Sequence, residues 1–295
     1  MQWQGQRESD NVEDRRGMPG GQPMLIGGGL GTLAIVILVA LLGGDPIRFL
    51  QQVQQGQPQG RQQGPQGRPP EPGRAGPGGD GRHDVLKQFV SVVLADTEDV
   101  WDEVFREMGK TYRKPRLVLY NGHTSSGCGA ADSAVGPFYC PVDETIYLDL
   151  GFFSLLRSRF GAPGEFAQAY VIAHEVGHHV QKLLGTMGEV DALRRRAGKT
   201  ESNHLSVGLE LQADFLAGVW ANRCDRAKHI IEGGDVEAAI RAAQAIGDDQ
   251  LQREAQGYVV PDSFTHGSSA QRVYWFRLGL KTGDLRQGDT FRSNR

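Results

Sequence analysis

The sequence has few cysteines, little net charge and one long hydrophobic run. Its three cysteines form no C-x-x-C pair, which excludes a zinc site built from thiolates. Its net charge of −3 gives no basic footprint, so nucleic acid is not an expected partner. Cys128 and Cys140 could pair if their domain lies in an oxidising compartment, whereas Cys224 ends an apolar helical stretch and is interpreted as a small core residue.

The one long hydrophobic run, residues 24–44, contains no charged residue. A span of about 20 apolar residues crosses a bilayer core of about 30 Å, so this run predicts an uncleaved transmembrane helix. A cleaved signal peptide is the alternative, but its apolar region is usually shorter and no clear Ala-x-Ala site follows the run. Arginine is slightly more frequent before the run than after it, which favours a cytoplasmic N-terminus and an extracytoplasmic main domain.

The composition indicates one substantial domain with appendages. The stretch before the hydrophobic run is polar, and the stretch after it is rich in Gln, Gly and Pro, which cannot bury a core. The predicted parts are a polar tail at 1–23, a transmembrane helix at 24–44, a disordered linker at 45–82 and a folded domain at 83–295.

Within the folded domain, the apolar pattern predicts helices and a small sheet. Apolar residues recur at helical spacing over 84–109 and 166–184. Residues 116–120 are typical of a short strand, and residues 136–141 and 145–150 flank a polar turn, as in a hairpin. We therefore predict a mostly helical α+β fold, in which a strand beside a metal cleft could bind an extended peptide by edge addition.

The helix at 166–184 contains the motif H-E-x-x-H. His174 and His178 are four residues apart, so both imidazoles lie on one helix face and can bind one metal ion. Neutral imidazole suits zinc, and Glu175 is adjacent, where it can accept a proton from a water at the metal. The alternative is a pair of surface histidines beside a glutamate, but the apolar neighbours indicate a buried helix.

A third ligand is needed, and the extended motif H-E-x-x-H-x-x-G-x-x-H is absent. Gln181 occupies the position of its glycine, and Leu184 occupies the position of its third histidine. Glu210 and Asp214 are again four residues apart on a mostly apolar helix, where two carboxylates without a cation would be costly. We predict that Glu210 binds the metal and that Asp214 accepts the ring N–H of a ligating histidine. The alternative is a pair of surface acids.

His266 lies in a loop before the last predicted helix, and loop residues are often presented to a cleft. Hydrolysis at a metal site commonly uses a further donor for the oxyanion, and a histidine can be that donor. We therefore predict a catalytic role for His266. The alternative is that it caps the final helix or packs under Trp275.

These residues give the chain a clear family resemblance. It resembles the bacterial family of neutral zinc metallopeptidases, which are single-pass membrane proteins. The resemblance implies a zincin-like catalytic domain with a glutamate as third ligand, located at the bacterial inner membrane and tethered by one transmembrane helix. The matching segments are 3–5, 8–16, 126–129, 136–141, 174–179, 210–214 and 262–268.

The expected function is that of a zinc metallopeptidase with a peptide or protein substrate. The two histidines and Glu210 hold the ion, and Glu175 takes the proton of the attacking water. One alternative is a non-catalytic binding or scaffold module with structural zinc, which a fourth protein ligand from His204 or Asp214 would favour. Another is a zinc amidase that acts on cell-wall peptides.

Overall fold

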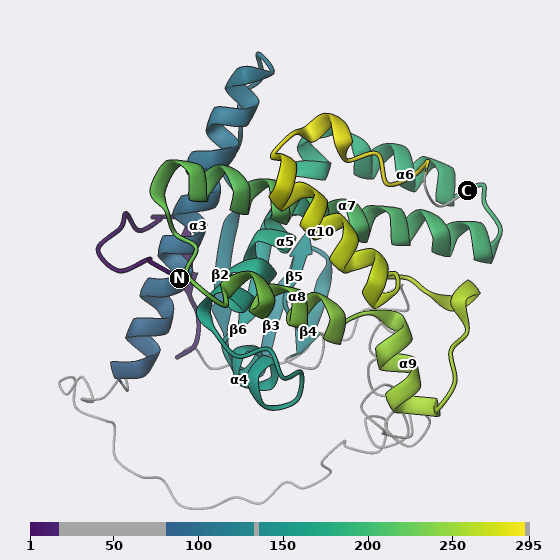
Figure 1. Cartoon of the computed structure of the whole chain (residues 1–295), viewed down its shortest axis with the longest axis horizontal. Helices are drawn as coiled ribbons and strands as arrows, with labels where there is room; N and C mark the ends of the chain where they lie inside the picture. Colours follow the sequence, from purple (N-terminus) through teal and green to yellow (C-terminus); the bar gives the residue numbers. More distant parts are fainter. Residues whose placement is uncertain (18–80, 133–135, 293–295) are drawn as a thin grey trace, which may run out of the picture.

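The structure is a computed structural model that describes residues 1–17, 81–132 and 136–292. Most of this part of the chain is helical and packs around a small sheet (Figure 1). The helices are α3 (Gly81–Glu107), α4 (Gly151–Ser158), α5 (Glu165–Leu184), α6 (Thr186–Arg194), α7 (Lys199–Lys228), α8 (Asp235–Ala245), α9 (Asp248–Gln256) and α10 (Ser269–Thr282), with short 3-10 turns η2 (Pro261–Ser263) and η3 (Leu285–Gln287). The predicted α+β class is confirmed.

Four of the described strands form one sheet in the order β1-β2-β6-β5. Strands β1, β2 and β6 run parallel, and β5 pairs antiparallel with β6, which confirms the predicted hairpin. Strand β5 lies at the edge of this sheet, and β3 and β4 form a separate hairpin. The strands are β1 (Val12–Asp14), β2 (Arg116–Tyr120), β3 (His123–Ser126), β4 (Gly129–Asp132), β5 (Phe138–Cys140) and β6 (Thr145–Asp149).

The N-terminal segment, residues 1–17, is part of this folded unit. Strand β1 pairs with β2, and the rest of the segment runs beside α3 (Figure 1). Trp3 is 4% exposed and packs edge-on against Phe89, with ring centroids 5.4 Å apart. Buried Glu98 on α3 accepts hydrogen bonds from Ser9 Oγ and Asn11 Nδ2 at 2.5 and 2.7 Å. A buried carboxylate needs such partners, so this contact ties the segment to α3.

The predicted inner-membrane topology is wrong. In the part of the chain that the structure describes, no helix is both long and apolar enough to cross a bilayer. The span predicted at 24–44 lies outside the described residues. One crossing there would place Val12–Asp14 and Arg116–Tyr120 on opposite sides of a membrane, whereas these strands pair in one sheet. The pairing of β1 with β2 therefore contradicts a cytoplasmic N-terminus with an extracytoplasmic domain.

A disulfide joins Cys128 to Cys140, with the two Cα atoms 5.8 Å apart. Cys128 lies in the turn between β3 and β4, and Cys140 ends β5, so the bridge holds this hairpin beside the edge strand. Cys224 is free and buried, as expected for a core residue.

Helices α7 and α10 approach each other through two glycines. A Cβ atom on Gly218 would lie 2.2 Å from the carbonyl oxygen of Phe276, and one on Gly279 would lie 2.1 Å from that of Phe215. Both distances are far below contact distance, so only glycine fits at this crossing. The close approach places α10 directly against α7 (Figure 1).

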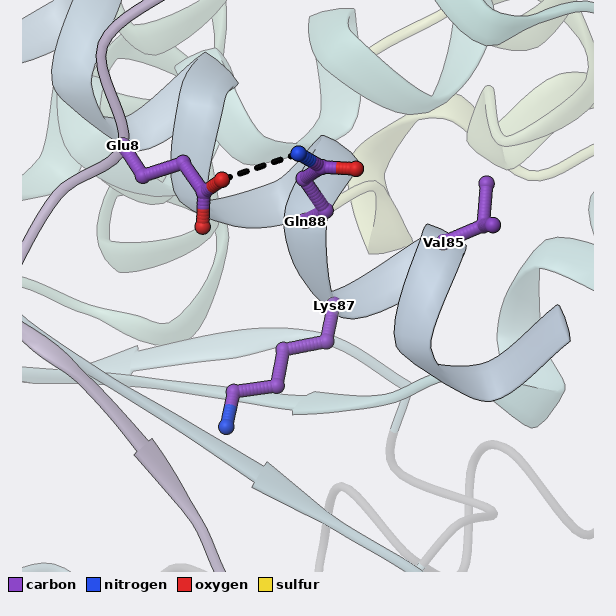
Figure 2. A pocket seen from close by; sticks show the side chains of 4 residues that line it. All are labelled: Glu8, Val85, Lys87 and Gln88. Atoms are coloured by element: carbon purple, nitrogen blue, oxygen red, sulfur yellow. Dashed lines mark hydrogen bonds between the residues drawn. The ribbon is translucent and has the colours of Figure 1, made fainter. Parts of the chain in front are cut away.

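A shallow cavity of about 340 Å³ lies between the N-terminal segment and α3 (Figure 2). Its lining residues are Glu8, Val85, Lys87 and Gln88, and the Gln88 amide donates to Glu8 Oε1 at 2.9 Å. None of the predicted site residues lines this cavity, so it is separate from the predicted metal site.

Candidate metal centre

The two motif-bearing helices pack closely because of a glycine inside the first motif. A Cβ atom on Gly177 would lie 3.0 Å from the carbonyl oxygen of Ala213 on α7 and 3.1 Å from its Cα. Gly177 lies between the two motif histidines, and Ala213 lies between Glu210 and Asp214. This contact therefore brings the H-E-x-x-H turn of α5 against the predicted acidic pair of α7.

Three of the predicted residues converge at this contact. His174, His178 and Glu210 offer ligand atoms that all lie within 4.8 Å of one another. The Nε2 atoms of the two histidines both face the Glu210 carboxylate, at 3.3 Å from Oε2 and 3.5 Å from Oε1. Two imidazoles and one carboxylate are a donor set that zinc takes in catalytic sites. The donor chemistry of these residues therefore fits zinc.

Asp214 is fully buried and contacts the first histidine. Its Oδ1 atom lies 2.8 Å from Nδ1 of His174 and accepts the Tyr170 hydroxyl at 2.5 Å. Arg272 from α10 donates to both carboxylate oxygens, at 2.7 and 2.9 Å. Burial raises the pKa of Asp214, but the charges of Arg272 and His174 outweigh it and lower that pKa to about 2. Asp214 is thus an ionised acceptor for the His174 ring N–H.

The second histidine contacts Gln181, the residue that stands in place of the glycine of the extended motif. Gln181 Oε1 lies 2.9 Å from Nδ1 of His178, three residues earlier on the same helix. Burial lowers the pKa of His178, which favours the neutral imidazole that a metal requires. The i, i+3 spacing was the sequence signal for this pair.

Glu175 lies beside the ligands and is 8% exposed. Burial raises the pKa of its carboxyl to about 7, the Glu210 charge adds to the shift, and the His174 charge opposes it. The backbone of Tyr139, in edge strand β5, lowers this pKa and is the weakest of the named influences on it. A carboxyl with a pKa near neutrality can accept a proton at physiological pH, as a general base must.

His266 is positioned by Asp248, a residue that the sequence analysis missed. Asp248 is the first residue of α9, and its Oδ2 accepts the backbone N–H groups of Thr265, His266 and Gly267 at 2.7, 2.7 and 3.1 Å. Its Oδ1 lies 3.1 Å from Nδ1 of His266. The His266 side chain is 48% exposed, so it is presented to solvent rather than packed under Trp275.

His204, suggested as a possible fourth ligand, does not join the ligand group. It is exposed, whereas Asp214 contacts His174 through the nitrogen that faces away from Glu210. Within residues 1–17, 81–132 and 136–292, the group that could hold a metal ion consists of His174, His178 and Glu210. Structural zinc sites usually have four protein ligands, so this three-residue group favours a catalytic site.

Comparison with known proteins gives the chain a family. A family model described as "Putative neutral zinc metallopeptidase" matches residues 1–291. The protein YpfJ of Escherichia coli strain K12 is 49% identical over 296 residues, which cover 99% of each chain. The protein Rv2575 of Mycobacterium tuberculosis strain H37Rv is 42% identical over 214 residues, which cover 69% of this chain and 71% of that protein.

The names of both relatives call them uncharacterized, and no solved structure matches the chain. The family match extends over nearly the whole length and includes both ligand-bearing helices. The chain therefore belongs to the family of neutral zinc metallopeptidases, and zinc is the cofactor that its His174, His178 and Glu210 group fits.

Proposed function

We propose that this protein is a zincin-like metallopeptidase that hydrolyses peptide bonds. The observation that carries the proposal is the convergence of three ligands beside Glu175, a buried carboxyl with a pKa of about 7. His174, His178 and Glu210 would hold the ion. Bound zinc supplies a Lewis acid that polarises a carbonyl group and lowers the pKa of a water.

Glu175 moves the proton in this proposal. Its carboxylate accepts the proton of the attacking water, and its raised pKa suits it to this role near neutral pH. Because Glu175 is buried, bulk water does not surround its carboxyl group, and the pKa of that group stays near the working pH.

The substrate is an extended peptide that lies beside β5. This strand is at the sheet edge and lies against α5, where the Tyr139 hydroxyl is 2.9 Å from Nδ1 of His179. An edge strand binds an extended chain through backbone hydrogen bonds, which do not depend on the side chains of that chain. The Cys128–Cys140 bridge fixes the C-terminal end of this edge.

His266 is the proposed donor to the oxyanion. Asp248 occupies its Nδ1, so Nε2 is the nitrogen left for a substrate oxygen. Nε2 carries a proton in this arrangement when the ring is an imidazolium. Partial removal from water lowers the pKa of His266, but the Asp248 hydrogen bond and the Glu210 charge outweigh it and raise that pKa. A raised pKa keeps the donor form at neutral pH.

Zinc content of the purified full-length protein tests the ligand assignment. We expect about one equivalent in the wild type, and loss of that equivalent in His178→Ala and Glu210→Ala. His204→Ala is the matched control, because His204 is an exposed histidine on the same helix as Glu210. If the His178 and Glu210 variants keep the zinc content of the control, the ligand assignment is wrong.

A further inference from the structure

We propose that Gln181 is a positioning residue that fixes the tautomer of His178 and links this ligand to the turn of α7 that carries Glu210. The proposal rests on the assignment of His178 as a metal ligand. It adds a second, chemically different partner to the site, since His174 is held by the carboxylate of Asp214 and His178 by a neutral amide.

The orientation of the Gln181 amide is determined by its other contacts. Its Nε2 lies 2.7 Å from the carbonyl oxygen of Leu209 and 3.1 Å from Oε1 of Gln212. A backbone carbonyl can only accept a hydrogen bond, so the Gln181 nitrogen must face Leu209. A flipped amide would place two oxygens against each other and lose both of these bonds. The Gln181 oxygen therefore faces His178.

This orientation sets the proton on the histidine. The Gln181 oxygen can only accept, so Nδ1 of His178 must carry the ring proton that it donates across 2.9 Å. In the neutral ring, Nε2 then has a free lone pair, and Nε2 is the atom that faces Glu210. Gln181 thus selects the tautomer in which the ligand atom is ready for a metal.

The same amide connects the two ligand-bearing helices. Leu209 directly precedes Glu210, so the Gln181–Leu209 hydrogen bond holds α5 and α7 in register at the ligands. Gln181 is fully buried, and water does not compete for these bonds. Gln212 continues the chain of contacts by donating to the carbonyl oxygen of Gly288 at 3.0 Å.

Two variants of Gln181 distinguish the effect of its hydrogen-bond acceptor from the effect of its side-chain packing. Gln181→Met has a similar shape, but its thioether sulfur is only a weak acceptor for the Nδ1 proton. Gln181→Glu keeps an acceptor that faces Nδ1 but cannot donate to the Leu209 carbonyl when ionised. His178→Ala tests the ligand itself, so a failure of the ligand assignment is distinguishable from a failure of this proposal.

The first readout is the affinity for zinc, measured on the full-length protein by competition with a chelator. We expect Gln181→Met to weaken zinc binding by about 10–100-fold, the usual effect of removing a partner of a ligating histidine. We expect Gln181→Glu to stay closer to the wild type. An equal loss in the two variants would assign the effect to the lost Leu209 hydrogen bond or to packing, and it would overturn the role of Gln181 in fixing the tautomer.

The second readout is the ring tautomer of His178, from ¹⁵N chemical shifts of the metal-free protein. We expect Nδ1 protonation in the wild type and in Gln181→Glu, and Nε2 protonation in a share of the Gln181→Met molecules. An unchanged tautomer in Gln181→Met would overturn the proposal. So would a Gln181→Met protein that fails to fold while Gln181→Glu folds and binds zinc normally, because Gln181 would then have only a structural role.

Discussion

The N-terminal segment should be necessary for the stability of the domain, and Trp3→Ala tests this most sharply. The Trp3 side chain is 4% exposed and packs on Phe89 of α3. A buried aromatic side chain covers about 150–250 Å², which at about 25 cal/mol per Å² corresponds to about 4–6 kcal/mol. Truncation of such a side chain to alanine typically costs about 3–5 kcal/mol. We therefore expect the free energy of unfolding to fall by about 3–5 kcal/mol.

The assay is urea unfolding of the full-length protein, followed by circular dichroism. Gln4→Ala is the matched control, since Gln4 is adjacent to Trp3 but exposed, and surface substitutions usually change stability by less than about 0.5 kcal/mol. If Trp3→Ala and Gln4→Ala unfold at the same urea concentration, the segment does not pack on α3. The correction of the membrane topology would then lose its physical basis.

Three further predictions concern the site and its support. Asp214→Ala should weaken zinc affinity about 10–100-fold in a chelator competition, because the His174 ring loses its acceptor. Gly218→Ala should lower the free energy of unfolding by about 1–3 kcal/mol or more, because the added methyl group overpacks against α10. Gly188→Ala should raise the free energy of unfolding by about 0.5–1 kcal/mol, because Gly188 lies in α6 with open space around it. His266 should act as a donor only while protonated: partial removal from water lowers its pKa, but Asp248 and Glu210 outweigh this effect and raise that pKa. Activity should therefore fall as pH rises through the pKa of His266, and Asp248→Asn should move this alkaline limb of the kcat profile to lower pH. An unmoved limb would remove His266 from the proposed chemistry.

The ligand-bearing helices were predictable because the residue spacings that identify them lie within each helix. The i, i+4 spacing of His174 and His178 puts both on one face of any helix that contains them, and the same holds for Glu210 and Asp214. The helix expected at 166–184 is observed as Glu165–Leu184, ending at Gly185, whose φ of 91° favours glycine. Periodicity and a terminating glycine were sufficient for this element.

The partners that hold the site were not predictable, because they come from distant parts of the chain. Arg272 reaches Asp214 across 58 residues, and Asp248 holds His266 across 18. Neither residue belongs to a motif with fixed spacing, so only the packing of α7 against α10, and of α9 beside the His266 loop, brings them together. Gln181 was within reach of sequence reasoning, but its role depends on Leu209 of another helix.

The N-terminal strand was missed for a similar reason. Val12–Asp14 is a short, mostly charged segment with no alternation of apolar residues, and its partner Arg116–Tyr120 is far away in the sequence. A strand that is stabilised mainly by pairing with the edge of a formed sheet cannot be recognised from the strand propensity of its own residues. The membrane topology was wrong because this pairing was not visible in the composition of the tail.

The most direct test of the account is hydrolysis of a diverse peptide mixture by the zinc-loaded full-length protein in ¹⁸O-labelled water, read by mass spectrometry. The account predicts cleaved peptides with one ¹⁸O atom in each new carboxyl group. It predicts that Glu175→Gln keeps the fold and one zinc equivalent but cleaves at least about 10²-fold more slowly, the lower range for loss of a general base. A folded, zinc-loaded wild type that cleaves no peptide, or a Glu175→Gln protein that cleaves as fast as the wild type, would contradict the proposed function.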